Sequence, residues 1–286
     1  MIRFLVAAVS VLFFSVMAQA EPIRIVAAEN VYGDIARQIG GDHVAITSII
    51  SSPAQDPHLF EASASVAIAV SRADIIIYNG LDYDPWMEKL TASSKAVQRD
   101  IVVAGELAGF KTGDNPHVWY DLKTVSILAK ALAEKLVARD PAHTDDYRQN
   151  QTNFEASLLP ITKQIAEIAA THKATPVAAT EPVFGYMLMA MDLDVKEAEF
   201  QRAVMNDTEP SISDVARFEA DMKSKTVRLL VFNRQASSPL VEKMVTLAKA
   251  NAIPIVAVTE TEPQDKTYQQ WLSEEVSAIA VALDAH

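Results

Sequence analysis

Short runs of apolar residues alternate with helical patterns along the chain from residue 21 onward. In the first half, the apolar runs predict strands over 23–28, 43–50, 74–80 and 97–103, and the segments between them predict helices over 31–39, 63–73 and 85–91. Buried strands that alternate with helices are typical of a parallel sheet with helices on both faces. The first half therefore predicts an α/β lobe.

The middle of the chain is helical over its longest uninterrupted stretch. One helical pattern covers Leu122–Arg139, and a second begins at Asp140 and Pro141 and extends to about His172. Asp140 is predicted to be the N-cap, because a short polar side chain followed by proline is typical of a helix start. Pro160 predicts a kink in this helix. We interpret the helix as a rigid connection between two halves.

The alternation resumes after this helix. Strands are predicted over 176–180, 193–200, 227–233 and 253–259, and helices over 183–191, 212–223, 239–251 and 268–283. The pattern therefore predicts an α/β protein made of two lobes with parallel sheets, joined by one long helix. The expected bounds are 21–139 for the first lobe, 140–173 for the connecting helix and 174–286 for the second lobe.

The first twenty residues have the pattern of a signal peptide. Arg3 precedes an apolar run from Phe4 to Val16, and Ala18-Gln19-Ala20 is a typical cleavage site. The run is shorter than the ~20 apolar residues of a membrane span. The chain contains no cysteine, so a disulfide or a thioether lipid anchor is not expected. We expect cleavage after Ala20 and a soluble, monomeric periplasmic protein.

Charge and motifs narrow the possible functions. The formal net charge of −12 argues against a nucleic acid or an anionic lipid as partner, and is compatible with a cation as ligand. The chain has no H-E-x-x-H, G-x-S-x-G, Walker or G-x-G-x-x-G motif, and its 8 glycines make a phosphate-binding loop unexpected. We therefore do not expect an enzyme.

Potential metal donors stand where strands of such sheets end, which is where open α/β sheets bind ligands. His58 follows the second predicted strand, His117 precedes the 122–139 helix, Glu181 follows strand 176–180, and Glu260 follows strand 253–259, with Glu262 two residues on. Imidazole and carboxylate groups are typical ligands of divalent transition metals. If the lobes face each other, these donors converge between them.

Each of these residues also has a structural interpretation. Pro-His sequences such as those at His58 and His117 occur in capped loops, Glu181 could stabilise a helix start, and Glu260 could lie in a solvated turn. His43, His143, His172 and His286 are interpreted as structural or exposed. A metallohydrolase and a receptor for an organic solute, with Trp86, Trp119 and Trp271 lining its cleft, are the alternatives.

Six segments, in order, resemble the metal-binding solute receptors of bacterial ABC transporters, the zinc/manganese family: DPHLFEAS, ADIIIYNG, NPHVWYDL, DPAHTDDYRQN, EPVFGYM and TEPSISDV. The resemblance implies two Rossmann-like lobes joined by one rigid helix, which capture one divalent metal ion, Mn²⁺ or Zn²⁺, and deliver it to a membrane permease.

The resemblance also implies the metal ligands. His58 and His117 match the family's first and second histidine ligands. Glu181 matches the third position, which is histidine in typical zinc receptors and glutamate in typical manganese receptors. Glu260 stands where aspartate is usual, with Glu262 as an alternative. The 105–115 segment lacks the histidine-rich loop of many zinc receptors. The glutamate at position 181 and the missing histidine-rich loop both favour manganese, although imidazole and carboxylate sites generally bind Zn²⁺ more tightly.

Overall fold

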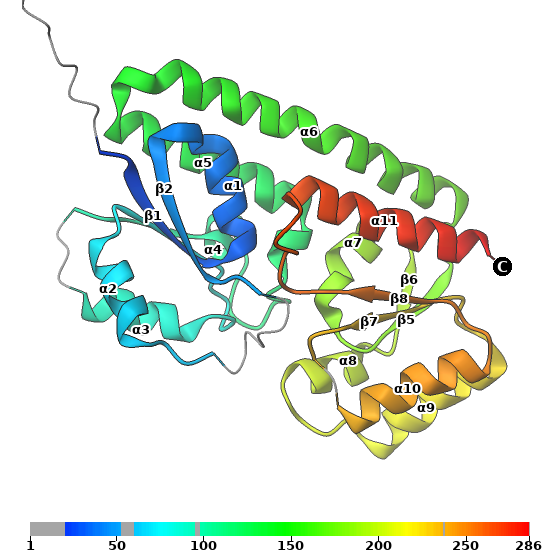
Figure 1. Ribbon diagram of the computed structural model, residues 1–286. Coiled ribbons are helices and arrows are strands. Elements are labelled where there is room, and N and C mark those ends of the chain that lie inside the picture. The colour runs from blue at the N-terminus through cyan, green and yellow to red at the C-terminus, as the bar shows by residue number, and fades with distance from the viewer. Residues whose placement is uncertain (1–20, 53–59, 95–97, 237, 286) are drawn as a thin grey trace, which may run out of the picture.

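Two parallel sheets lie side by side beneath one long helix in the computed structural model (Figure 1). The structure describes residues 21–52, 60–94, 98–236 and 238–285. The predicted signal peptide, His58 and His286 lie outside the described residues. No helix among the described residues is both long and apolar enough to span a membrane.

The N-terminal lobe is built on a four-stranded sheet in the order β2-β1-β3-β4, in which all neighbours are parallel. Its strands are β1 (Ile23–Glu29), β2 (Val44–Ile50), β3 (Ile75–Tyr78) and β4 (Asp100–Val103). Its helices are α1 (Asn30–Gly40), α2 (Ala64–Arg72), α3 (Pro85–Ser93), α4 (Ala104–Leu107) and α5 (Leu122–Arg139). Short 3-10 helices cover Gly41–His43 and Val118–Tyr120.

The C-terminal lobe repeats this topology with the strand order β6-β5-β7-β8. Its strands are β5 (Pro176–Ala179), β6 (Asp194–Lys196), β7 (Leu230–Asn233) and β8 (Ile255–Val258). Its helices are α7 (Gly185–Ala190), α8 (Ala198–Met205), α9 (Ile212–Ser224), α10 (Pro239–Ala250) and α11 (Tyr268–Asp284). The long helix α6 (Thr144–Thr171) connects the two lobes. The predicted fold class is confirmed.

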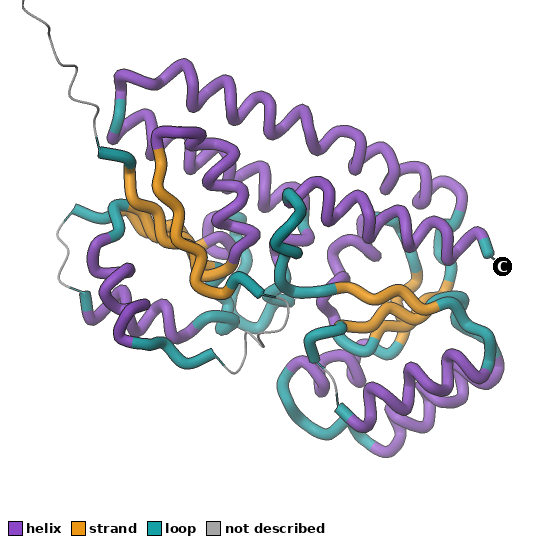
Figure 2. The backbone as a smooth tube through the Cα atoms, in the orientation of Figure 1, coloured by secondary structure: helices purple, strands orange, loops and turns teal. Residues whose placement is uncertain are grey.

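Alternate residues of each strand enter different hydrophobic layers, because successive side chains of a strand point to opposite faces of the sheet. In β1, Ile25 and Ala27 face the layer beneath α1 and α6, whereas Val26 and Ala28 face the layer beneath α2 and α3. In the C-terminal lobe, α8, α9 and α10 cover the corresponding outer face (Figure 2). Each lobe therefore has an outer layer of its own.

The inner layers of the two sheets form one continuous hydrophobic core. The buried face of α6 runs along this core and contributes Tyr147, Phe154, Leu158, Ile161, Ile165 and Ile168. The first part of α6 packs on α1 and α5, and α11 packs along α6 from the C-terminal lobe. The lobes thus share their largest apolar layer, which we call the shared core.

Two local expectations differ from the structure. The predicted strand over 193–200 is wrong in its second half, because Glu197 adopts a left-handed conformation that ends β6, and α8 begins at Ala198. Asp140 is the N-cap residue of a 3-10 helix over Pro141–His143 and not of α6, and its carboxylate makes no capping hydrogen bond but accepts one from Tyr147 Oη. The helix α6 runs through Pro160 to Thr171, close to the predicted end at His172, and the kink at Pro160 stays a prediction.

Candidate metal centre between the lobes

Buried polar side chains gather where strands of both sheets end. Glu29 ends β1, and Asn79 directly follows β3 in the N-terminal lobe. Glu181 follows β5 after one residue, Asn233 ends β7, and Glu260 follows β8 after one residue. Polar groups are buried only when they have partners or a function. Their position at the carboxyl ends of parallel strands is the usual place of a ligand site.

His117 is fully buried directly before the 3-10 helix Val118–Tyr120. Its Nδ1 lies 2.6 Å from Asn115 Oδ1, while Asn115 Nδ2 donates a hydrogen bond of 2.7 Å to the carbonyl of Pro182 in the other lobe. Because an amide oxygen can only accept, His117 Nδ1 carries the hydrogen. The tautomer therefore leaves Nε2 as the basic nitrogen, and Nε2 lies 3.7 Å from Glu260 Oε2.

The carboxylates of Glu181 and Glu260 are held together by one amide group. Asn233 Nδ2 donates to Glu181 Oε2 at 2.7 Å and to Glu260 Oε1 at 2.5 Å. Tyr83 Oη donates to the second oxygen of Glu260 at 2.8 Å. Two buried carboxylates repel each other when both are ionised, and donors directed at them reduce this cost. An imidazole and two carboxylates thus lie together in a setting that suits a divalent cation.

Other acidic groups lie in the same buried region. Burial raises the pKa of Tyr83 well above its usual value, with Glu260 adding to the shift, so Tyr83 stays a protonated donor. Burial also raises the pKa of Glu29, and the neighbouring Asp84 raises it further. Asp84 accepts hydrogen bonds from the backbone amides of Asn79 and Gly80. The region is therefore strongly acidic and excludes most solvent.

Glu262 occupies a different position from Glu260. Its side chain lines a separate cleft with Asn30, Asp34 and Arg37, where burial, reinforced by Asp34, raises its pKa to about 9. Its backbone amide donates to Asn30 Oδ1, and its carbonyl accepts from Asn30 Nδ2. The structure therefore brings Glu260, and not Glu262, together with His117 and Glu181. His58, the fourth candidate donor, lies outside the described residues.

The contacts of these donors disagree with a purely structural role. Glu181 precedes the 3-10 helix Pro182–Phe184, but its side chain makes no capping hydrogen bond and contacts Asn233 instead. Glu260 is 1% exposed, so it does not lie in a solvated turn. Trp119 and Trp271 are buried in the shared core, and Trp86 packs against the outer layer of the N-terminal lobe. They therefore do not line an open cleft for an organic solute.

Sequence reasoning missed three residues that position these donors. Asn115 fixes the His117 tautomer, Asn233 bridges the two carboxylates, and Tyr83 bonds to Glu260 across the lobes. A signal existed for two of them: Asn115 directly precedes the Pro-His pair, and Asn233 ends a predicted strand as Glu181 and Glu260 follow theirs. Tyr83 lies in a loop without any such pattern.

Two α/β lobes joined by a long helix, with an imidazole and two carboxylates buried where both sheets end, define the class of two-lobed metal-binding receptors. The chain belongs to the family of the periplasmic component A of the zinc-uptake complex, whose model matches residues 25–282. The family consists of solute-binding receptors of ABC transporters, which work with a membrane permease. The resemblance inferred from the sequence is confirmed.

The chain is also similar in sequence or in structure to individual metal-binding proteins. The chain is 29% identical over 182 residues to the manganese ABC transporter substrate-binding lipoprotein PsaA of Streptococcus anginosus, a match that covers 55% of this chain and 59% of that one. The periplasmic zinc-binding protein TroA from Treponema pallidum superposes with a TM-score of 0.76 at 21% identity, covering 92% of this chain and 99% of that chain. The Mn-bound periplasmic metal-binding protein from Candidatus Liberibacter asiaticus gives a TM-score of 0.72 at 18% identity, covering 91% and 99%.

Proposed function

We propose that the chain captures one divalent transition metal ion between its lobes through His58, His117, Glu181 and Glu260, and delivers it to an ABC permease. The observation that carries the proposal is the pair of buried carboxylates, Glu181 and Glu260, joined by Asn233 beside His117. Two carboxylates and two imidazoles would form a neutral site with a divalent cation. The ion is cargo, so its binding must be reversible.

We propose Mn²⁺ or Zn²⁺ as the cargo. Two glutamates supply hard oxygen donors, which suit Mn²⁺, whereas imidazole suits Zn²⁺, and an imidazole–carboxylate site generally binds Zn²⁺ more tightly. The relatives support both ions, because one is named for manganese and another for zinc.

We further propose that the mature chain begins after Ala20 and acts in the periplasm as a monomer without a lipid anchor and without enzymatic activity. The absence of cysteine supports the missing anchor, in contrast to the relative that is a lipoprotein. The proposed lobes are 21–139 and 174–286, with 140–173 as the connection. The intact mass of the protein exported by a bacterial host tests the cleavage site and any added lipid.

Metal analysis with matched glutamate variants tests the site. Protein freed of metal is titrated with Zn²⁺ and Mn²⁺ in competition with a chelating dye. Glu260→Gln replaces one proposed donor carboxyl group by an amide, and Glu262→Gln makes the same replacement two residues away in the separate cleft. We expect Glu260→Gln to weaken binding at least tenfold and Glu262→Gln to leave it nearly unchanged. Full affinity in Glu260→Gln would refute the proposed site.

A further inference from the structure

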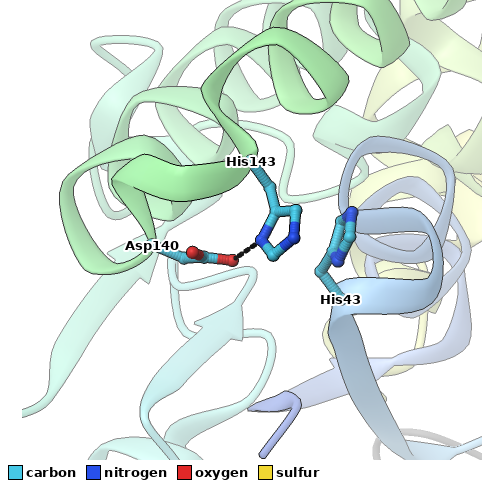
Figure 3. Close-up of side chains that lie close together, drawn as sticks. All are labelled: His43, Asp140 and His143. Atoms are coloured by element: carbon cyan, nitrogen blue, oxygen red, sulfur yellow. Dashed lines mark hydrogen bonds and ion pairs between the residues drawn. The ribbon is translucent and has the colours of Figure 1, made fainter. Parts of the chain in front are cut away.

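Three side chains that no sequence pattern groups together meet at the end of the N-terminal lobe where α6 begins. His43 ends the 3-10 helix that links α1 to β2, and Asp140 and His143 lie at the two ends of the 3-10 turn that precedes α6 (Figure 3). One nitrogen or oxygen from each of the three lies within 4.8 Å of the others. The two imidazole rings are stacked, with centroids 3.8 Å apart and planes inclined by 23°.

A carboxylate bonds to one nitrogen of each ring. His143 Nδ1 lies 2.6 Å from Asp140 Oδ2, and His43 Nε2 lies 3.0 Å from Asp146 Oδ2. Because an ionised carboxylate only accepts hydrogen bonds, the bonded nitrogen of each neutral ring carries the hydrogen. His43 Nδ1 is then a basic nitrogen, and an ion bound by both His143 and Asp140 would lie between them, in place of the hydrogen on His143 Nδ1. A carboxylate behind a histidine, as Asp146 lies behind His43, is the usual arrangement around metal-binding histidines, and it makes the ring a better donor.

Asp140 is itself held in place by a buried residue. Tyr147 is fully buried, donates a hydrogen bond of 2.8 Å to Asp140 Oδ2, and packs edge-on against His43. A carboxylate has about four lone-pair positions, so Asp140 can bind these partners and still offer an oxygen to an ion. This arrangement explains why Asp140 does not cap α6.

We propose that His43, His143 and Asp140 form a second transition-metal site, separate from the cargo site and weaker than it. Two imidazoles and one carboxylate suit Zn²⁺ or Cu²⁺ far better than Mn²⁺, since affinity for such donors rises from Mn²⁺ to Cu²⁺. In stacked imidazole rings the lone pairs of the nitrogens point in parallel directions. One ring must therefore rotate before a nitrogen of each ring can bind the same ion. The side chains are 27% and 38% exposed, which leaves room for that turn and for water ligands.

An ion at this site would link the 3-10 helix between α1 and β2 to the start of the connecting helix α6. These segments come from distant parts of the chain and already pack together. The metal would therefore stabilise the docking of α6 on the N-terminal lobe. This role is independent of cargo binding between the lobes.

Native mass spectrometry and calorimetric titration with Zn²⁺ on the full chain test the proposal. We expect the unmodified protein to bind two ions, one tightly and one weakly. The double variant His43→Asn/His143→Asn should lose the weak ion alone. His172→Asn is the matched control, because His172 forms a comparable surface pair with Asp284, at 3.0 Å, in which no other histidine of the described residues takes part. It should bind both ions.

A cargo-site variant separates this proposal from the proposed function. Glu260→Gln should weaken the tight ion and leave the weak one. Electron paramagnetic resonance with Cu²⁺ adds a direct readout: the weak site should show coupling to two nitrogens, which the double variant loses. Thermal unfolding of each variant without metal verifies that it is folded. A chain that binds no second Zn²⁺, or a double variant that still binds it, would overturn the proposal.

Discussion

Replacing Glu181 with alanine separates its proposed role as a metal ligand from a purely structural role. The change removes the hydrogen bond from Asn233 Nδ2 to Glu181, and hydrogen bonds to charged groups contribute about 1.5–3 kcal/mol. It also removes the repulsion between two buried carboxylates, which offsets part of that loss. Without metal, we therefore expect a change in unfolding free energy of about 1 kcal/mol or less.

With metal, the variant and the unmodified protein should differ clearly. A ligand present at 100 times its dissociation constant stabilises the folded state by about 2.7 kcal/mol. If the loss of Glu181 weakens binding about 100-fold, the same metal concentration stabilises the variant by only about 0.4 kcal/mol. Since 1 kcal/mol shifts the melting temperature of a protein this size by roughly 2–4 °C, the metal-induced rise should shrink by about 5–9 °C.

The assay is thermal unfolding of metal-free protein with and without added Mn²⁺ or Zn²⁺. Glu209→Ala is the control, because Glu209 is an exposed acid of the same lobe and its loss changes the net charge equally. Glu181→His should keep a metal-induced rise and shift the preference towards Zn²⁺, since it adds an imidazole nitrogen. If Glu181→Ala keeps the full rise, Glu181 is not a ligand and the proposed site is wrong there.

Three further predictions concern pH and the contact between the lobes. Metal affinity should fall below about pH 6, because protons compete with the metal for His58 and His117, and the ordinary pKa of histidine is ~6.5. A competition titration that finds the same affinity from about pH 7.5 to about pH 5 would contradict imidazole ligation. Burial raises the pKa of Glu275 from 4.5 to about 8, so the folded state retains a proton there that the unfolded chain releases, and stability falls as pH rises through this interval. Urea unfolding should show a smaller loss of stability from about pH 5 to about pH 8 in Glu275→Gln than in the unmodified protein, and equal losses would refute this assignment. Asn30→Ala removes both hydrogen bonds to the backbone of Glu262 in the other lobe and should cost about 1–3 kcal/mol in the same unfolding assay, whereas an unchanged midpoint would show that the contact does not stabilise the protein.

The elements that the sequence predicted well are those with a strong periodic pattern. The bounds of α5 agree with the prediction, since an apolar face and an N-cap at Asp121 fix that helix locally. The short helices α4 and α8 were not predicted, because too few residues carry the pattern and the turn at Glu197 is set by its surroundings. Local sequence patterns therefore predict long helices more accurately than short ones.

The residues of the candidate site also differ in whether the sequence alone can predict their roles. Glu181 and Glu260 could be proposed from the sequence, because the carboxyl ends of parallel strands meet at one edge whatever the details of packing. The bridging role of Asn233 could not, since it depends on how two side chains turn towards one amide. The meeting of His43 with His143 depends on where α6 docks, which no local pattern encodes.

The shared core beneath α6 determines how metal binding stabilises parts of the molecule that lie far from the metal site. Because one apolar layer includes residues of both sheets and of α6, neither lobe can expose its inner face without disrupting the other. The protein should therefore open as one cooperative unit at its most protected positions. The slowest amide hydrogens of β1, β5 and the middle of α6 should then exchange with solvent at similar rates. Cargo binding should slow all of them by a common factor, even in the part of α6 far from the ion.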